Sequence, residues 1–164
     1  MTTESKVKNA TTLLHSGKVK ERQEGLSALR NIFSQNSSIE RFYNVAGRDG
    51  RKPSHEIWAP ILDGLQTCIR SEKSAFVTAK KSTDVIEKRL AAAAGTYRWF
   101  VEKSMMHFAK KTVLEICHFL YREMKVRETL IPSVALDFIK AYECVASHPP
   151  HLARLEEDEI EWEE

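Results

Sequence analysis

The stretch Leu14–Leu29, which reads LHSGKVKERQEGLSAL, decides how this chain folds. It has the spacing L-x3-K-x2-E-R-x3-L-x2-L, and on a helix the offsets of three and four residues bring Arg22, Leu26 and Leu29 to one face. A guanidinium among apolar neighbours keeps its charge at any ordinary pH and therefore needs an anion. We expect a carboxylate from an adjacent helix to pair with Arg22, while Lys18 lies nearer the solvent.

Six residues of this motif are the candidate binding residues of the chain. Their charges allow two interpretations: an outward cluster that binds another protein or another part of a longer chain, or a scaffold helix. In the scaffold interpretation Lys18 and Glu21 form an exposed i,i+3 pair worth about 0.2–0.5 kcal/mol. The candidate residues are Leu14, Lys18, Glu21, Arg22, Leu26 and Leu29.

Apolar residues recur at helical spacing along the whole chain. They predict helices over residues 7–14, 18–35, 58–69, 86–108, 113–124 and 134–145. We expect the first helix to be capped by Thr3 or Ser5, and the third to be capped by Ser54 or to begin at Pro60. Asn36–Ser38 is expected to end the motif helix.

These periodicities favour an all-α fold, because no sustained alternation of β-branched and polar residues indicates a strand. Helices of this length joined by short turns suit either a bundle or a stack of antiparallel pairs. The spacing of the residues does not decide between the two, since the sequence contains no crisp internal repeat.

The motif resembles the short N-terminal motif of the ATM family of phosphatidylinositol-3-kinase-like protein kinases, whose fungal members maintain telomere length. Two later blocks are similar to the helices that follow it in that family: Ile57–Leu62 leading through Ile69–Glu72 to Lys80–Lys81, and the alanine-rich Arg89–Lys103. The resemblance therefore covers nearly the whole chain. It implies an α-solenoid of stacked antiparallel pairs, as in HEAT-like repeats.

The same resemblance implies a function. The chain would be the N-terminal recognition and scaffold segment of a serine/threonine checkpoint kinase that acts in telomere maintenance and the response to DNA double-strand breaks. The implied partners are the break-sensing nuclease complex, DNA ends and the rest of the kinase, in the nucleus and also in the cytoplasm, with no membrane. ATP and Mg²⁺ would belong to a kinase domain outside these 164 residues, so no cofactor is expected in this chain.

Nothing in the 164 residues predicts a catalytic residue. The sequence contains no glycine-rich phosphate loop, no catalytic Asp with its Asn, and no His-Glu-x-x-His pair. The six histidines lack the spacing of a zinc site, so no metal is expected. Three cysteines form an odd, widely spaced set, which indicates buried thiols in a reducing compartment.

Charge divides the chain near its end. From Leu152 onward there are seven acidic residues and one arginine, whereas residues 1–151 contain 24 basic and 16 acidic side chains. We expect residues 1–151 to form the helical-repeat domain and residues 152–164 to begin a further helix. The excess of positive charge makes DNA contact a further interpretation. Its candidate phosphate contacts are Arg48, Arg51 and Lys52.

Aromatic residues beside basic ones also suggest base stacking, but helical spacing favours a place in the core for Tyr97 and Trp99. Two alternatives to the kinase segment therefore stay open at this point. One is a stand-alone helical adaptor that binds other proteins, and the other is a DNA-binding helical domain, whose affinity would fall steeply with salt.

Overall fold

A computed structural model of the chain describes residues 2–46, 53–81, 83–125 and 131–147. Within these ranges the chain forms seven α-helices and one 3-10 helix, and no strand. The predicted all-α class is confirmed. The elements are α1 (Thr3–Leu14), α2 (Val19–Ile32), α3 (Asn36–Ala46), α4 (Ser54–Thr78), α5 (Asp84–Ser104), η1 (Met105–His107), α6 (Lys110–Lys125) and α7 (Pro132–Ser147).

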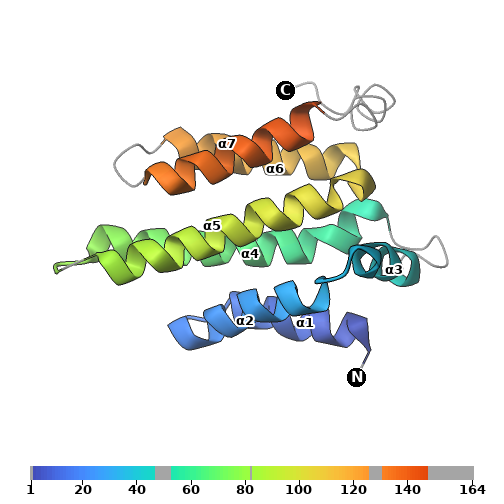
Figure 1. Cartoon of the computed structure of the whole chain (residues 1–164), viewed down its shortest axis with the longest axis horizontal. Helices are drawn as coiled ribbons and strands as arrows, with labels where there is room; N and C mark the ends of the chain where they lie inside the picture. The colour runs from blue at the N-terminus through green and yellow to red at the C-terminus, as the bar shows by residue number, and fades with distance from the viewer. Residues whose placement is uncertain (1, 47–52, 82, 126–130, 148–164) are drawn as a thin grey trace.

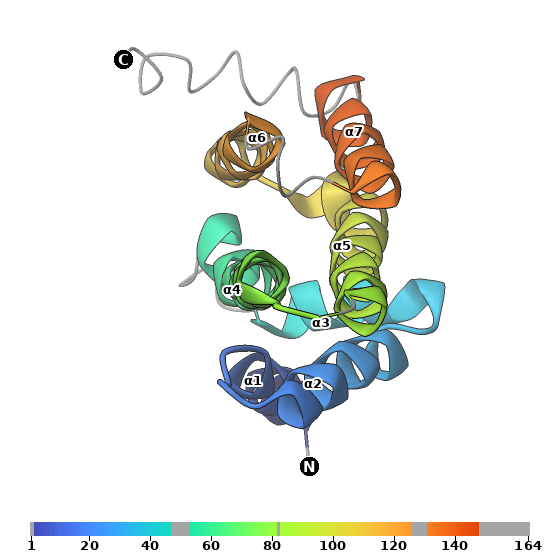
Figure 2. The same ribbon diagram turned by 90° about the vertical axis from the view of Figure 1, so that its left-hand side faces the viewer.

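Six of the helices form three layers of two, which Figure 2 shows nearly end-on. Helices α1 and α2 make the first layer, α4 and α5 the second, and α6 and α7 the third. Between layers, α1 packs on α4, α2 on α5, α4 on α6 and α5 on α7. Helix α3 crosses one end of the first two layers and contacts α1 and α5. The middle layer is therefore covered on both sides.

The motif helix is present, with bounds Val19–Ile32 instead of the predicted 18–35. Glu21 lies in its first turn and Arg30 in its last, which places each charge where the helix dipole favours it. The helix before it is capped by Thr2, whose side chain accepts a hydrogen bond from the Ser5 amide at 3.1 Å. The prediction that Thr3 or Ser5 caps this helix was therefore wrong.

Helix α3 was not predicted, because Asn36–Ser38 was interpreted as a stop. The structure starts a helix there instead, since Asn and Ser are also favoured at helix N-termini. Its inner face is apolar: Ile39 and Phe42 are buried, and the Phe42 ring meets Phe33 at 5.5 Å between centroids. Tertiary packing of that face fixes the helix across the end of the stack.

Two further boundaries differ from the predictions. Helix α4 begins at Ser54 and contains Pro60 in its interior, so the alternative of a start at Pro60 was wrong; its N-cap is Pro53, so the predicted Ser54 cap was wrong as well. Helix α5 ends at Ser104, and Phe108 lies beyond η1 in extended backbone instead of inside the predicted helix 86–108. Phe108 is still fully buried, because its ring packs edge-on against Trp58 at 6.0 Å.

One continuous hydrophobic core joins the layers. Trp58 lies near its centre, fully buried, with aromatic neighbours on α3, α5 and the segment after η1. Among the described residues, no helix combines the length and apolar composition needed to span a bilayer. The predicted division before residue 152 lies outside the described residues, and so does the acidic end.

Candidate functional site

The motif arginine is buried and paired. Arg22 is 4% exposed, and its Nη2 and Nε lie 3.2 Å and 3.4 Å from Oε2 of Glu72 on α4. Its Nη1 donates to the carbonyl oxygen of Ser16 at 3.1 Å. The expected carboxylate from an adjacent helix is therefore present, and that prediction is confirmed.

Glu72 serves a second guanidinium as well. Its Oε1 accepts from Nε of Arg89 on α5 at 2.9 Å, and Glu72 itself is only 2% exposed. One carboxylate thus joins α2, α4 and α5 through both of its oxygens. Removing one member of such a buried set leaves an uncompensated charge, which typically costs about 3–5 kcal/mol.

The turn between α1 and α2 is fixed by the neighbouring motif residue. Glu21 accepts a short hydrogen bond from the Ser16 hydroxyl, and that hydroxyl accepts from the Lys18 amide at 3.1 Å. Among the described residues no ion pair forms between Lys18 and Glu21, so the i,i+3 pair of the scaffold interpretation is absent. Glu21 and Arg22 instead both hold Ser16, while the Lys18 side chain is exposed, as predicted.

The motif leucines form the apolar part of the same junction. Leu14 and Leu29 are fully buried and Leu26 is 8% exposed. Leu14 lies against two glycines: a Cβ added at Gly25 of α2 would lie 3.0 Å from Leu14 Cγ, and one added at Gly64 of α4 would lie 3.2 Å from Leu14 Cδ1. The side chain of Leu14 therefore occupies the space that both glycines leave open.

Four of the six predicted site residues are thus buried, whereas Glu21 is half-buried at the turn between α1 and α2 and Lys18 is exposed. The phosphate candidates Arg48, Arg51 and Lys52 lie outside the described residues. Sequence reasoning missed Ser16, Glu72 and Arg89. A signal for Glu72 existed, because the next step of three along the buried ridge of α4 after Ile69 falls on this carboxylate.

The aromatic residues divide between core and surface. Tyr97 is fully buried, its ring centroid lies 5.2 Å from that of Phe119 with the rings tilted by 59°, and it accepts a hydrogen bond from Gln66, so its predicted place in the core is confirmed. Trp99 is half-buried, and the guanidinium of Arg30 lies 4.9 Å from its ring centroid. Arg30 also donates to Thr96 at 3.1 Å, so the pair links α2 to α5.

The cysteines are thiols with suppressed acidity. Desolvation raises the pKa of Cys68 to about 12; the charge of Glu72 adds to that rise and the charge of Arg22 opposes it. Burial also raises the pKa values of Cys117 and Cys144. All three are unpaired cysteines. A search of the described residues finds no group of metal-ligating side chains.

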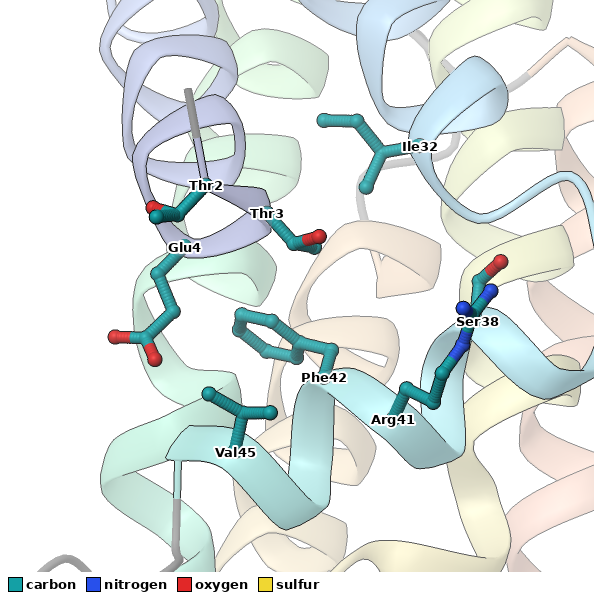
Figure 3. A pocket seen from close by; sticks show the side chains of 8 residues that line it. All are labelled: Thr2, Thr3, Glu4, Ile32, Ser38, Arg41, Phe42 and Val45. Atoms are coloured by element: carbon teal, nitrogen blue, oxygen red, sulfur yellow. The ribbon is translucent and has the colours of Figure 1, made fainter.

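A surface hollow lies between the start of α1 and α3 (Figure 3). Phe42 and Val45 of α3 and Ile32 of α2 give it an apolar side, and Glu4 and Arg41 stand at its rim. The lining contains hydroxyl groups, one carboxylate and one guanidinium. This donor set provides contact chemistry and does not form a nucleophile with a base.

Comparison with known proteins gives consistent matches. A family model described as telomere-length maintenance and DNA damage repair matches residues 7–163. The serine/threonine-protein kinase tel1 of Emericella nidulans is 26% identical over 159 residues, which cover 94% of this chain and 5% of that kinase.

Two further fungal kinases show the same relation. TEL1 of Candida albicans is 26% identical over 140 residues, covering 83% of this chain and 4% of the kinase. TEL1 of Kluyveromyces lactis is 29% identical over 120 residues, covering 68% and 4%. The chain thus spans at most about 5% of the length of these relatives. No solved structure matches it significantly.

Proposed function

From the premise that this chain belongs to the telomere-length maintenance and DNA damage repair family, we propose that it is an N-terminal segment of an ATM-type serine/threonine kinase. The kinase would act in telomere maintenance and the response to DNA double-strand breaks, in the nucleus. The names of the fungal relatives support this proposal. The segment's own role would be recognition and scaffolding, with ATP and Mg²⁺ bound elsewhere in the kinase.

We further propose that the fold is the start of an α-solenoid of HEAT-like repeats. The stacking of α1/α2, α4/α5 and α6/α7 in three layers supports this, because each layer contacts only its neighbours. In such proteins the repeats build an extended surface for partners. The first repeat then has to be held in a fixed position on the second.

The observation that carries the proposal is the pairing of Arg22 and Arg89 with Glu72. Four of the motif positions sit where α1 and α2 meet α4 and α5, so the motif sets how the first layer lies on the second. The exposed flank of α2, beginning with Lys18, would then contact the break-sensing nuclease complex or another part of the kinase. In this view the internal motif residues position the flank, and Lys18 makes the contact.

A binding assay separates these two roles. The complete chain would be immobilised and incubated with the purified nuclease complex, comparing the wild type, Lys18→Glu and Arg22→Ala. We expect both variants to bind more weakly, but only Arg22→Ala to lower the melting temperature, because Lys18 is exposed and Arg22 is buried. Lys111→Glu, an exposed lysine in the third layer, is the matched control and should bind normally.

Unchanged binding of both variants would contradict the proposed role of the motif. If the wild-type chain does not bind the nuclease complex, this result would favour a scaffold role without a partner in that complex. The stand-alone adaptor would be favoured if the open reading frame ended at residue 164.

Direct DNA binding is a second candidate, favoured by the half-buried Trp99 with Arg30 over its ring. It predicts a mobility shift of duplex DNA at low salt that weakens steeply as salt rises. Arg30→Ala should reduce this shift. The absence of any shift at low salt would remove the candidate.

A further inference from the structure

The outer face of the third layer exposes several large apolar side chains. On α7, three large side chains are exposed at steps of three residues: Leu136 is 52% exposed, Ile139 44% and Tyr142 46%. On α6, Tyr121 is 61% exposed. No described helix lies beyond this layer (Figure 2), so nothing within the described ranges covers it.

Helical periodicity places these side chains away from the core. The buried ridge of α7 consists of Val134, Phe138, Ala141 and Val145; Leu136 and Ile139 lie on the side of the helix away from this ridge, and Tyr142 lies at its edge. Contiguous apolar surface of this kind on a protein marks a place where another element packs. We call the set of Tyr121, Leu136, Ile139 and Tyr142 the end face.

Three positive side chains border the end face, and one exposed carboxylate, Glu143 of α7, lies on the same side of the helix. Arg122 and Lys125 of α6 and Lys140 of α7 are all exposed, and the ammonium of Lys125 lies 5.4 Å from the ring centroid of Tyr121. A segment that fits this surface needs apolar side chains for its centre and carboxylates for its border.

Residues 152–164 have that chemistry. They contain Leu152, Leu155, Ile160 and Trp162 among seven carboxylates. They follow closely after α7, which ends at Ser147, and the family match continues to residue 163. Because the segment is tethered next to the end face, its effective concentration there is high.

We propose that residues 152–164 pack as a helix across the end face, with their apolar side chains on Leu136, Ile139 and Tyr142 and their carboxylates beside Arg122, Lys125 and Lys140. The inference goes beyond the proposed function, since it concerns the chain's own next layer and requires no binding partner. The binding assay with the nuclease complex therefore does not test this inference, and each can fail without the other.

Hydrogen exchange on the complete chain tests the proposal. We expect the amides of residues 152–164 to exchange at least about tenfold more slowly than in an unstructured peptide of the same sequence. In Ile139→Glu this protection should disappear, while the amides of α7 itself stay protected, because the buried ridge of α7 is unchanged. Ser27→Glu, an exposed position on α2 in the first layer, should keep the protection.

A second measurement follows Trp162 directly. In chains labelled with 5-fluorotryptophan, the fluorine resonance that disappears in Trp162→Phe belongs to this residue. Ile139→Glu should shift that resonance and leave those of Trp58 and Trp99 in place. The double charge reversal Arg122→Glu with Lys125→Glu should lower the protection of residues 152–164, and added salt should partly restore it, because salt screens the repulsion between like charges.

Three results would overturn the proposal. The first is wild-type exchange of residues 152–164 at the unstructured rate. The second is protection that Ile139→Glu does not change, which would place the segment elsewhere. The third is a wild-type dimer, measured by sedimentation, that Ile139→Glu dissociates while residues 152–164 exchange freely, since a second copy would then occupy the end face.

Discussion

The two ends of the stack are built differently. The outer surface of the first layer exposes polar side chains, namely Lys6, Asn9, Lys20, Gln23, Glu24, Ser27 and Asn31. In the described helices α1 and α2, no large apolar side chain is exposed. The outer surface of the third layer instead exposes Tyr121, Leu136, Ile139 and Tyr142.

This difference indicates which end meets water and which end meets protein. Stacked helical repeats need a terminal layer with a polar outer face, because each inner layer buries apolar surface on both sides. The first layer has that property and the third does not. The polar layer is also held to its neighbour by the buried set around Glu72, whereas the third layer is held by the nearly buried pair of Lys73 with Glu123 at 2.9 Å and by the more exposed pair of Arg98 with Asp137 at 3.1 Å.

The largest effect is expected at the buried charge. Glu72→Gln keeps the shape of the side chain but leaves Arg22 and Arg89 without an anion, so the free energy of unfolding should fall by about 3–5 kcal/mol. Urea unfolding followed by circular dichroism measures this. A loss below about 1 kcal/mol would show that the polar layer is held by its apolar contacts alone.

The next largest loss of stability is expected at the glycine contacts of Leu14. In Gly25→Ala the new Cβ would lie 2.9 Å from the Ala10 carbonyl oxygen and 3.0 Å from Leu14 Cγ, and such overpacking costs about 1–3 kcal/mol. Thermal unfolding of the variant measures the loss. Gly17→Ala is the matched control, because nothing lies within 4 Å of its added Cβ. Equal stability of the two variants would mean that α1 and α2 separate at little cost.

A pH effect of about 1 kcal/mol is expected at Cys68, which lies in the middle layer beside the buried charge. Its pKa rises from 9.0 to about 12 on folding, so the folded chain keeps a proton that the unfolded chain loses. This contribution to stability is complete below pH 9 and is lost as the pH rises toward 12.

Between pH 9 and pH 10 the free energy of unfolding should therefore fall by about 1 kcal/mol through this thiol. Cys68→Ala should remove that part of the slope, whatever its effect at neutral pH. Urea unfolding at both pH values gives the two slopes. Identical slopes would show that the thiol titrates alike in the folded and unfolded chains.

The smallest effect is expected at the apolar end. Asp137→Asn removes the pair with Arg98, whose side chain is 34% exposed, so the cost should be about 0.2–1 kcal/mol. Comparing this loss with that of Glu72→Gln in the same buffer gives the contrast between the two ends directly. A loss as large as that of Glu72→Gln would remove the contrast.

The sequence allowed prediction of the parts of the structure that depend on one helix at a time. The apolar stripe of the motif helix and the need of Arg22 for an anion follow from periodicity and charge alone. The identity of the anion does not, because Glu72 is 50 residues away and only the stacking of the second layer on the first brings it near.

The local prediction at Asn36–Ser38 was wrong, and the role of two glycines could not be predicted. Asn36–Ser38 has the composition of both a helix start and a loop. Only the burial of Ile39 and Phe42, on the inner face of α3, favours the helix. The glycines at positions 25 and 64 weaken a helix when considered alone. Their role is visible only where Leu14 fills the space that they leave.

The adjacent residues Glu72 and Lys73 set the rotational position of α4. Glu72 holds α2 and α5 on one side, and Lys73 pairs with Glu123 of α6 at 2.9 Å on another. Since consecutive side chains of a helix diverge by about 100°, turning or sliding α4 by one residue would break both sets of bonds together. The position of α4 therefore couples the first layer to the third, because this one helix carries the charged bonds to both.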